Sequence, residues 1–246
     1  MKVISCSYTI HYQPILKLRE RIFEIENLLA GKFQTPLNLI PVPDEAPPEI
    51  PRISAISLHG HTSLNLSMVN AQVITQFDDC YAPNAEKCID YMMEKEELLS
   101  SIMDTITAKP LYSGLITQLE YEKNSKPVEY IKNHFLGANL IGSLNDVSMR
   151  LTYTVENDYY INIEIFNKRI YELPTLQFIK PPTQGELKEK AHVLGLSLDI
   201  NDRFGYNSQS GYFTDNDKIN KIFYLTKTTI ENKMQSYVEG GIVDNG

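Results

Sequence analysis

The sequence is poor in cysteine, and it lacks a long apolar run. Its three cysteines, Cys6, Cys80 and Cys88, form no C-x-x-C pair and are odd in number, so a disulfide framework is not expected. No stretch approaches the roughly 20 apolar residues that cross a bilayer. The first residues, MKVISCSYTIHY, alternate instead of forming the apolar core of a signal peptide. We therefore expect a soluble protein in a reducing, cytoplasmic setting, with no membrane partner.

Strongly basic clusters are also missing. The chain carries 31 acidic and 23 basic residues, which gives a formal net charge of -8. Because phosphate backbones repel such a chain, nucleic acid is not the expected partner. Hydrophobic residues make up 42% and charged residues 22% of the sequence, so the chain can build a substantial globular core.

Known catalytic and nucleotide-binding motifs do not occur. There is no G-x-S-x-G nucleophile elbow, P-loop or G-x-G-x-x-G pattern. Cys80 follows Asp78 and Asp79, whose negative charges would raise the pKa of its thiol. Cys6 and Cys88 fall in a strand pattern and on the apolar stripe of a helix pattern. We expect all three thiols to pack in the fold, and we expect no cofactor.

The N-terminal third mixes strand, helix and proline signals. Residues 2–12 alternate and predict a strand, whereas apolar residues at spacings of three and four predict a helix over about 14–30. Residues 35–52 contain six prolines, which exclude a helix or a central strand there. We interpret this segment as a rigid connector; a proline-motif docking site is the alternative.

Residues 53–77 have a period of two. Leu64, Leu66 and other apolar residues fall on even positions from 56 to 68, and His59, His61 and hydroxyl or amide residues fall on odd positions. This pattern predicts a strand with one dry face and one wet face. A turn around Asn70 and a return strand over 72–77 would complete a hairpin, with both histidines directed into water.

The rest of the chain alternates between strand and helix signals. A long helix is predicted over about 84–107, a strand over 111–122 and a short helix over 125–135. A meander follows, with strands at 147–157, 159–167 and 169–178. Residues 186–195 are ambiguous between a helical turn and a loop, 196–202 predict another strand, and 202–213 predict a loop. A final helix, capped by Thr214, is expected over about 215–238.

Taken together, these signals predict one α+β domain over residues 1–246. About eight strands would form an antiparallel sheet, and three long helices would pack on one of its faces. The order of elements in residues 1–110 resembles the order in residues 111–246, which suggests two pseudo-repeated halves without a residue-level repeat.

His59 and His61 are the only pair in the sequence that suggests metal chemistry. Two histidines spaced by one on a strand project to the same side and could serve as metal ligands or acid/base groups, but a site needs further ligands. Asp78 and Asp79, at the far end of the hairpin, are the nearest candidates. Without a further ligand motif, we interpret the pair as solvated and assign no metal site.

The segment 204–213, FGYNSQSGYF, has the composition of a binding loop. Aromatic residues in a background of Gly, Ser and Asn provide contact area at low entropic cost. The candidate partner-binding residues are Phe204, Tyr206, Tyr212 and Phe213. The alternative is an ordinary loop whose aromatic rings fold back onto the core.

Residues 53–236 resemble a sporadically distributed bacterial protein family of about 250 residues with no assigned activity. The resemblance is carried by the order of SLNLSMVNAQVITQFDD, a long helix, LYSGLITQLEY, a meander and LSLDIN, followed by DNDKINKIFYLTKTTIENKM. The family's R-x-G-x-R-Y-x-N strand corresponds to YSGLITQLEYE, which keeps Gly114 but lacks both arginines. The scattered distribution of the family implies a mobile or phage-defence-associated setting.

These observations favour a non-enzymatic interaction module that binds another protein or itself through the wet sheet face or the 204–213 segment. The first alternative is a metal-dependent or histidine-assisted phosphoester hydrolase that uses His59 and His61. The second alternative is a small-molecule sensor with a pocket between the sheet and the helices.

Overall fold

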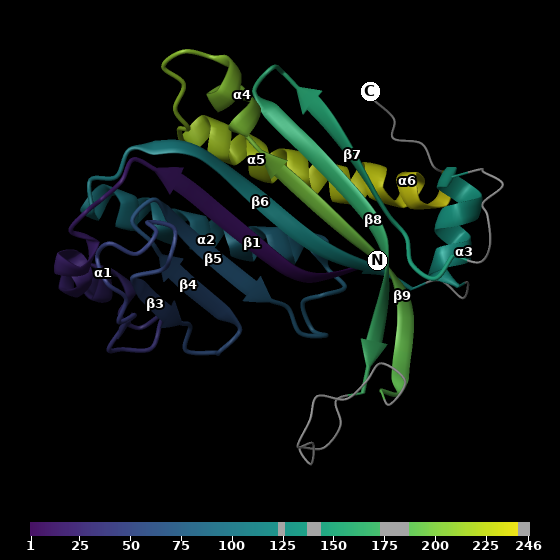
Figure 1. Cartoon of the computed structure of the whole chain (residues 1–246), viewed down its shortest axis with the longest axis horizontal. Helices are drawn as coiled ribbons and strands as arrows, with labels where there is room; N and C mark the ends of the chain where they lie inside the picture. Colours follow the sequence, from purple (N-terminus) through teal and green to yellow (C-terminus); the bar gives the residue numbers. More distant parts are fainter. Residues whose placement is uncertain (123–125, 137–143, 173–186, 241–246) are drawn as a thin grey trace.

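The computed structural model describes residues 1–122, 126–136, 144–172 and 187–240, which form an α+β fold (Figure 1). The predicted antiparallel sheet is confirmed, but its described part has nine strands instead of eight. Their bounds are β1 Lys2–Tyr12, β2 Asn38–Leu39, β3 Ile53–Ile56, β4 Thr62–Leu66, β5 Asn70–Gln76, β6 Pro110–Tyr121, β7 Ser148–Val155, β8 Tyr159–Tyr171 and β9 Glu189–Asn201. The strand order is β2-β3-β4-β5-β1-β6-β9-β8-β7.

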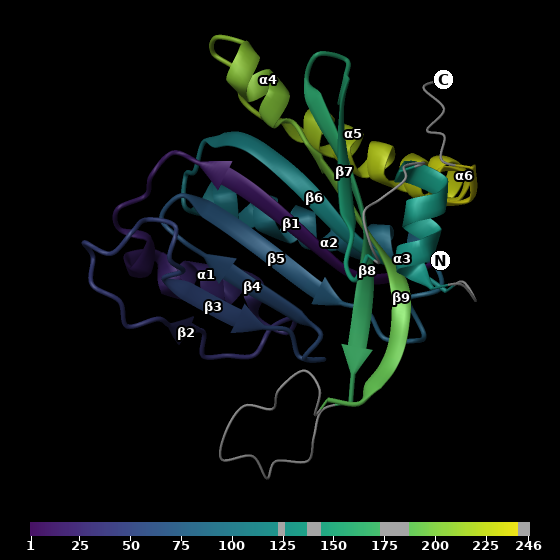
Figure 2. The same cartoon turned by 45° about the vertical axis from the view of Figure 1, so that its right-hand side comes forward.

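The described helices outnumber the three long helices and one short helix that the sequence predicts. They are α1 Ile22–Leu29, α2 Ala85–Thr105, α3 Pro127–Ile131, α4 Arg203–Ser208, α5 Asn216–Thr228 and α6 Gln235–Gly240. A π-helical segment, Thr229–Met234, joins α5 to α6, so the predicted final helix is present as one almost continuous rod. Views from two sides show α1, α2 and α5 on the same face of the sheet (Figures 1 and 2).

Strands β1 and β6 lie next to each other at the centre of the sheet, and each half of the chain continues outward from one of them. In the first half the spatial order is β1, β5, β4, β3; in the second it is β6, β9, β8, β7. A helix follows each central strand in the chain, and a longer helix follows β5 and, after α4, β9. The two halves therefore contribute matching sets of elements to one sheet.

The core lies between the sheet and the helices on this face. Cys6, Tyr8 and Ile10 of β1 are buried, and the Tyr8 ring lies 5.3 Å from that of Phe223 in α5. Met92 of α2 is also fully buried. Burial of each such side chain contributes roughly 1.5–3 kcal/mol, so the apolar alternation of β1 and the apolar stripe of α2 fix which face the helices cover.

The opposite face is lined by small polar side chains that bond to one another across strands. Gln72 donates to Ser7 over 3.1 Å and Gln118 donates to Ser197 over 2.9 Å. Asn162 donates to Asp199 over 3.0 Å. In both views α1, α2 and α5 leave this face uncovered (Figures 1 and 2). The short helix α4 contacts it at one end, through Tyr112 and Tyr160. We refer to it as the open face.

The predicted even/odd pattern of residues 53–68 is correct in β4 but wrong in β3. Leu64 and Leu66 are buried as expected, whereas Ile56 and Leu58 are 50% and 54% exposed and Ala55 is buried. The register explains the inversion, because Ile56 pairs with Ser63, an even position with an odd one. The turn between the strands therefore shifts the dry face by one residue.

Three other predicted boundaries also differ. Residues 14–17 are not helical, and the predicted helix begins with a 3₁₀ turn at Leu18–Arg21 before α1. The expected turn at 167–168 does not form, because β8 runs through it while paired with β9 over its whole length. The ambiguous 186–195 segment joins the next strand in β9 from Glu189 onward. Most of 169–178, and Ser125 of the short helix, lie outside the described residues.

Side chains cap α2 and α5, and the cap of α5 differs from the predicted Thr214. Asn84 caps α2 by accepting a hydrogen bond from the Lys87 backbone over 2.9 Å. Asp215, and not Thr214, caps α5 by accepting from the Lys218 backbone over 3.0 Å. A carboxylate at this position also interacts favourably with the helix dipole.

The proline-rich connector is held in place by two arginines. The fully buried Arg52 donates to the carbonyls of Ile50 and Ala46 over 2.7 and 2.9 Å. Arg19 donates to the carbonyls of Ile40 and Val42 over 3.0 and 2.6 Å. The connector is thus fastened to the body of the protein over most of its length.

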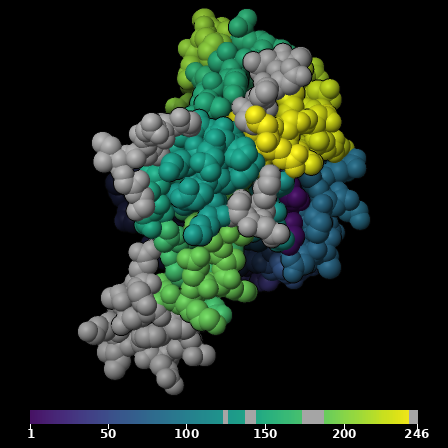
Figure 3. All heavy atoms as spheres, turned by 90° about the vertical axis from the view of Figure 1, so that its right-hand side faces the viewer, coloured from purple at the N-terminus to yellow at the C-terminus, as the bar shows by residue number. Residues whose placement is uncertain are grey.

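The end of the C-terminal rod packs on α3, as the space-filling view shows (Figure 3). The Tyr130 hydroxyl of α3 donates to the Val238 carbonyl of α6. Tyr237 is buried beside this contact, and its hydroxyl has no hydrogen-bond partner among the described residues.

We expect Tyr237→Phe to raise the free energy of unfolding by up to about 1 kcal/mol, because it removes a buried hydroxyl without a partner. Tyr130→Phe, which removes a bonded hydroxyl from the same contact, should lower it by about 1 kcal/mol. Urea unfolding of both variants measures the two changes. If both variants were destabilised equally, the Tyr237 hydroxyl would have to form a hydrogen bond in the folded protein, which would contradict the structure.

Candidate functional site

His59 and His61 lie in the turn between β3 and β4 and not on a strand, which corrects the sequence prediction. Gly60, between them, has a φ of +79°, a left-handed conformation that glycine adopts without strain. Both imidazoles are exposed, as predicted. The turn places them at the mouth of a cavity beside the edge of α2.

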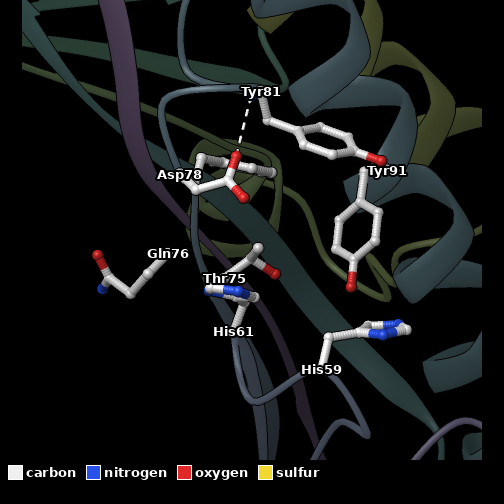
Figure 4. A pocket seen from close by; sticks show the side chains of 8 residues that line it. His59, His61, Thr75, Gln76, Asp78, Tyr81 and Tyr91 are labelled. Carbon is white, nitrogen blue, oxygen red and sulfur yellow. Dashed lines mark hydrogen bonds between the residues drawn. The ribbon is translucent and has the colours of Figure 1, made fainter.

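This cavity, which we call the histidine cavity, has a volume of about 320 Å³. The two imidazoles lie on one side of it, and Asp78, Tyr81 and Tyr91 lie on the other (Figure 4). Its lining residues are His59, His61, Thr75, Gln76, Phe77, Asp78, Tyr81 and Tyr91. The structure thus brings Asp78, but not Asp79, to the cavity that the histidines line.

Hydrogen bonds fix the walls of the histidine cavity. The Thr62 hydroxyl lies 3.0 Å from that of Thr75 and 2.9 Å from that of Tyr91, which ties α2 to the sheet. Asp78 Oδ1 accepts from the backbone N–H groups of Cys80 and Tyr81 over 3.0 and 3.1 Å. This turn fixes the carboxylate and the Tyr81 ring relative to each other.

The histidine cavity does not assemble a metal centre in the described part of the chain. No group of three or more His, Cys, Asp or Glu side chains there is arranged to hold an ion. Burial raises the pKa of the Cys6 and Cys88 thiols to about 12, so both remain protonated and pack as predicted. Cys80, which we also expected to pack, is exposed.

The predicted binding segment 204–213 is not a simple loop, because its first half forms α4. The Phe204 ring lies 5.1 Å from Tyr160, and the Tyr206 ring lies 5.0 Å from Tyr112. Both partners belong to the sheet, so these two side chains fold back as in the alternative interpretation. Tyr206 remains 37% exposed.

Tyr212 and Phe213, the other two candidate residues of this segment, lie in different environments. The Tyr212 ring covers Gly205 so closely that a Cβ there would lie 2.3 Å from it. Phe213 is 60% exposed, with the Lys218 ammonium 5.5 Å from its ring. Of the four aromatic residues that the sequence singles out, Phe213 offers the largest exposed surface.

Asp202 holds α4 against the sheet. Its buried carboxylate accepts from the Ser113 backbone N–H over 2.6 Å and from the Tyr212 hydroxyl over 3.1 Å. Burial raises the pKa of this carboxyl, although the hydrogen bonds oppose the shift. The group therefore stabilises the position of α4 at some cost in desolvation.

A second surface, which the sequence reasoning missed, lies at the end of the sheet. Strand β7 pairs with β8 on one side, and no described strand pairs with its other side. A groove of about 940 Å³ lies between β7–β8 and the α5 rod, and we call it the edge groove. Apolar side chains on its walls include Tyr153, Val155, Ile161, Ile163 and Leu225.

Charged residues lie along the edge groove. Lys221 pairs with Glu156 over 2.5 Å. Lys233 also lines the groove, is half-buried, and has no described carboxylate within ion-pair distance. The groove therefore combines an apolar lining with one ammonium that is not neutralised by its described neighbours.

Elsewhere in the described ranges, no helix has both the length and the hydrophobicity needed to cross a bilayer.

We expect Asp202→Asn to change how stability depends on pH. Because the folded-state pKa lies above the unfolded value of about 3.9, ionisation of Asp202 costs stability as pH rises through the folded-state pKa. The unfolding free energy of the variant relative to the parent should therefore increase between about pH 3.5 and 7. Urea unfolding across this range tests the sign, and a pH-independent difference would contradict it.

No protein-family model, no curated protein and no solved structure matches this chain. The family resemblance of residues 53–236 remains an expectation from the sequence.

Proposed function

We propose that the protein is a non-enzymatic protein-interaction module that binds an extended segment of another protein along the free edge of β7. The observation that carries this proposal is that no strand in the described part of the chain pairs with the outer edge of β7, beside the edge groove. Following the family resemblance, we further propose that it acts in the bacterial cytoplasm as an accessory component of a mobile or phage-defence-associated system.

The backbone of β7 supports strand addition. The Asn167 N–H donates to the Val147 carbonyl directly opposite it, at the start of the β7–β8 ladder. Hydrogen-bonded and non-hydrogen-bonded residues alternate along an antiparallel pair. By this alternation the amides of residues 148, 150, 152 and 154 point away from β8. A partner strand would satisfy these groups, as in other cases of β-augmentation.

The side chains of the edge groove supply the specificity. Because alternate residues of a strand point to the same face, every second side chain of an added segment would face Val155, Ile161 and Leu225. An aliphatic or aromatic residue at these positions would remove apolar area from water. An acidic residue near Lys233 would neutralise its charge. We therefore propose a partner segment with alternating apolar residues and at least one carboxylate.

The two surfaces predicted from the sequence are weaker candidates for the contact. Polar groups on the open face already bond to one another, as Gln72 does with Ser7 and Gln118 with Ser197. A partner on that face would have to replace these bonds. In the 204–213 segment, Phe204 and Tyr212 contact the protein itself. Phe213 remains the residue of that segment best placed to extend an interface.

A phosphoester hydrolase that uses His59 and His61 is the alternative function. Its support is the shared cavity with Asp78, which contributes one carboxylate. Under our proposal, protein incubated with zinc, manganese or iron and then dialysed should retain substoichiometric metal, and His59→Ala/His61→Ala should not change that amount. Stoichiometric metal that is lost in the double variant would favour the hydrolase.

We expect Thr154→Pro to block strand addition. Proline removes the outward amide but is tolerated at an edge position, so the fold should persist. Peptides selected on the protein from a displayed random library should show alternating apolar residues and a carboxylate. Their affinity, measured by fluorescence anisotropy, should fall by at least roughly tenfold in this variant. The variant loses the hydrogen bond of the residue 154 amide and displaces the added strand from its position along β7.

Thr154→Ala is the matched control, because it removes the same side chain and keeps the amide. It should bind the selected peptides like the parent protein. Lys233→Glu should reverse the preference for acidic peptides. Equal binding by the proline and alanine variants would contradict the proposal. A concentration-dependent dimer that Thr154→Pro abolishes would also overturn it, because the occupant would then be a second copy of the chain.

A further inference from the structure

We propose that the histidine cavity is a binding site for a small organic cation that carries a primary or quaternary ammonium group. This inference is independent of the edge groove, because the two surfaces share no lining residue. It rests on the charge, the aromatic walls and the size of the cavity.

The charge of the lining favours a cation. Asp78 contributes the one carboxylate of the lining, and the lining contains no Lys or Arg. Oδ1 of Asp78 accepts two backbone hydrogen bonds, whereas Oδ2 accepts none from the described residues. The second oxygen is thus available to an ammonium group, in a position that the turn already fixes.

The aromatic walls favour an organic cation over a metal ion. The Tyr91 ring lies 6.1 Å from Phe77 at an interplanar angle of 81°, and 6.3 Å from Tyr81 at 67°. Rings set at steep angles around a cavity present π faces and edges to its contents, and such faces attract ammonium groups. The Lys95 ammonium, 4.2 Å from the Tyr91 centroid, already makes this type of contact.

The charges next to the histidine cavity largely balance, so the preference for a cation rests on Asp78 and on the whole chain. Tyr81 and Tyr91 also line an adjacent cavity with the carboxylates of Asp90 and Glu94 and the ammonium of Lys87. Lys227 pairs with Asp90 over 3.9 Å, and Lys95 lies over the Tyr91 ring. The chain as a whole has a net charge of -8, which would steer cations toward the protein. Anionic ligands, such as phosphate compounds, are disfavoured by the same charges.

The size and the rim restrict the ligand to a small molecule. A volume of about 320 Å³ lies at the lower end of the roughly 300–1,000 Å³ range of ligand pockets. His59 and His61, at the mouth, each offer an acceptor nitrogen in the neutral form of the ring. A hydroxyl or amine substituent on the cation could donate to these nitrogens.

The test uses choline as the probe and its neutral isostere 3,3-dimethylbutan-1-ol as the comparison. Titrations at pH about 8, where free imidazole is neutral, are followed by amide chemical shifts in the isotope-labelled full chain. We expect saturable shifts around Tyr81, Tyr91 and the turn with choline, and none with the alcohol.

The decisive variants are Asp78→Asn and Asp79→Asn. Both remove one negative charge from adjacent positions, but Asp79 does not line the cavity. Asp78→Asn should weaken choline binding by roughly tenfold, as expected for loss of the Coulombic attraction between the carboxylate and the quaternary ammonium, whereas Asp79→Asn should change it less than about twofold. Thermal melting of both variants checks that the fold is retained.

Three outcomes would overturn the inference. These are equal weakening by the two asparagine variants, equal binding of choline and the alcohol, and the absence of saturable shifts in the parent protein. If Asp78→Asn has a lower melting temperature than the parent protein, Tyr81→Leu provides the second variant. It removes an aromatic ring from the cavity wall and keeps the carboxylate. Unchanged choline affinity in Tyr81→Leu would likewise overturn the inference.

Discussion

The antiparallel pairing of β1 with β6 is the interaction on which the rest of the structure depends. It joins the strands that begin the two halves of the chain, and it places Ser7 opposite Ile116 and Tyr8 opposite Leu115. Tyr8 and Leu115 are both fully buried, so the same ladder forms the centre of the sheet and the floor of the core. Loss of this pairing would separate the sheet into two parts, each with a newly exposed edge.

The arrangement of the helices follows from this central pair. Each half carries a long helix on the same face, and Lys227 of α5 pairs with Glu86 of α2 over 2.6 Å across the boundary between the halves. One face of the sheet is therefore dry and closed, and the other is polar and open. The outermost strands of the described sheet are β2 and β7. Strand β7 has 8 residues, whereas β2 has 2. A long edge strand is where a further strand can add.

The sequence predicts most of the elements whose pattern is local. The alternation of β1 and the apolar stripe of α2 identify both elements and their buried faces, because the buried residues from Cys6 to Tyr12 and along α2 follow the expected periods. Val3 departs from the alternation at an irregularity in the β1–β6 register. The prediction fails where contacts distant in the chain decide the structure. The charged start of β9 is a strand because it pairs with β8, and α4, with 6 residues, is too short for its periodicity to be recognised.

The same limit applies to the candidate sites. The sequence reveals individual residues, but the surfaces that they form depend on contacts between segments far apart in the chain. The sequence identifies His59 and His61, but the wall that faces them comes from the connection after β5 and from α2, which come together with the histidine turn only after the hairpin register is set. The edge groove has no sequence signal, because nothing in the SMRLTYTV pattern of β7 says that the strand lies last in the sheet. Its existence depends on topology, which periodicity does not determine.

The bonds that Arg19 and Arg52 make to the proline-rich connector also bear on the docking role considered for that segment. Domains that recognise proline motifs bind a polyproline II helix whose backbone is open to solvent. Here the carbonyls of Ile40, Val42, Ala46 and Ile50 are already occupied by guanidinium groups of the same chain. A domain that bonded to these carbonyls would have to displace the arginines, so the backbone of the segment supports the fold of its own chain, whereas Pro41, Pro43 and Pro47 remain exposed on its surface.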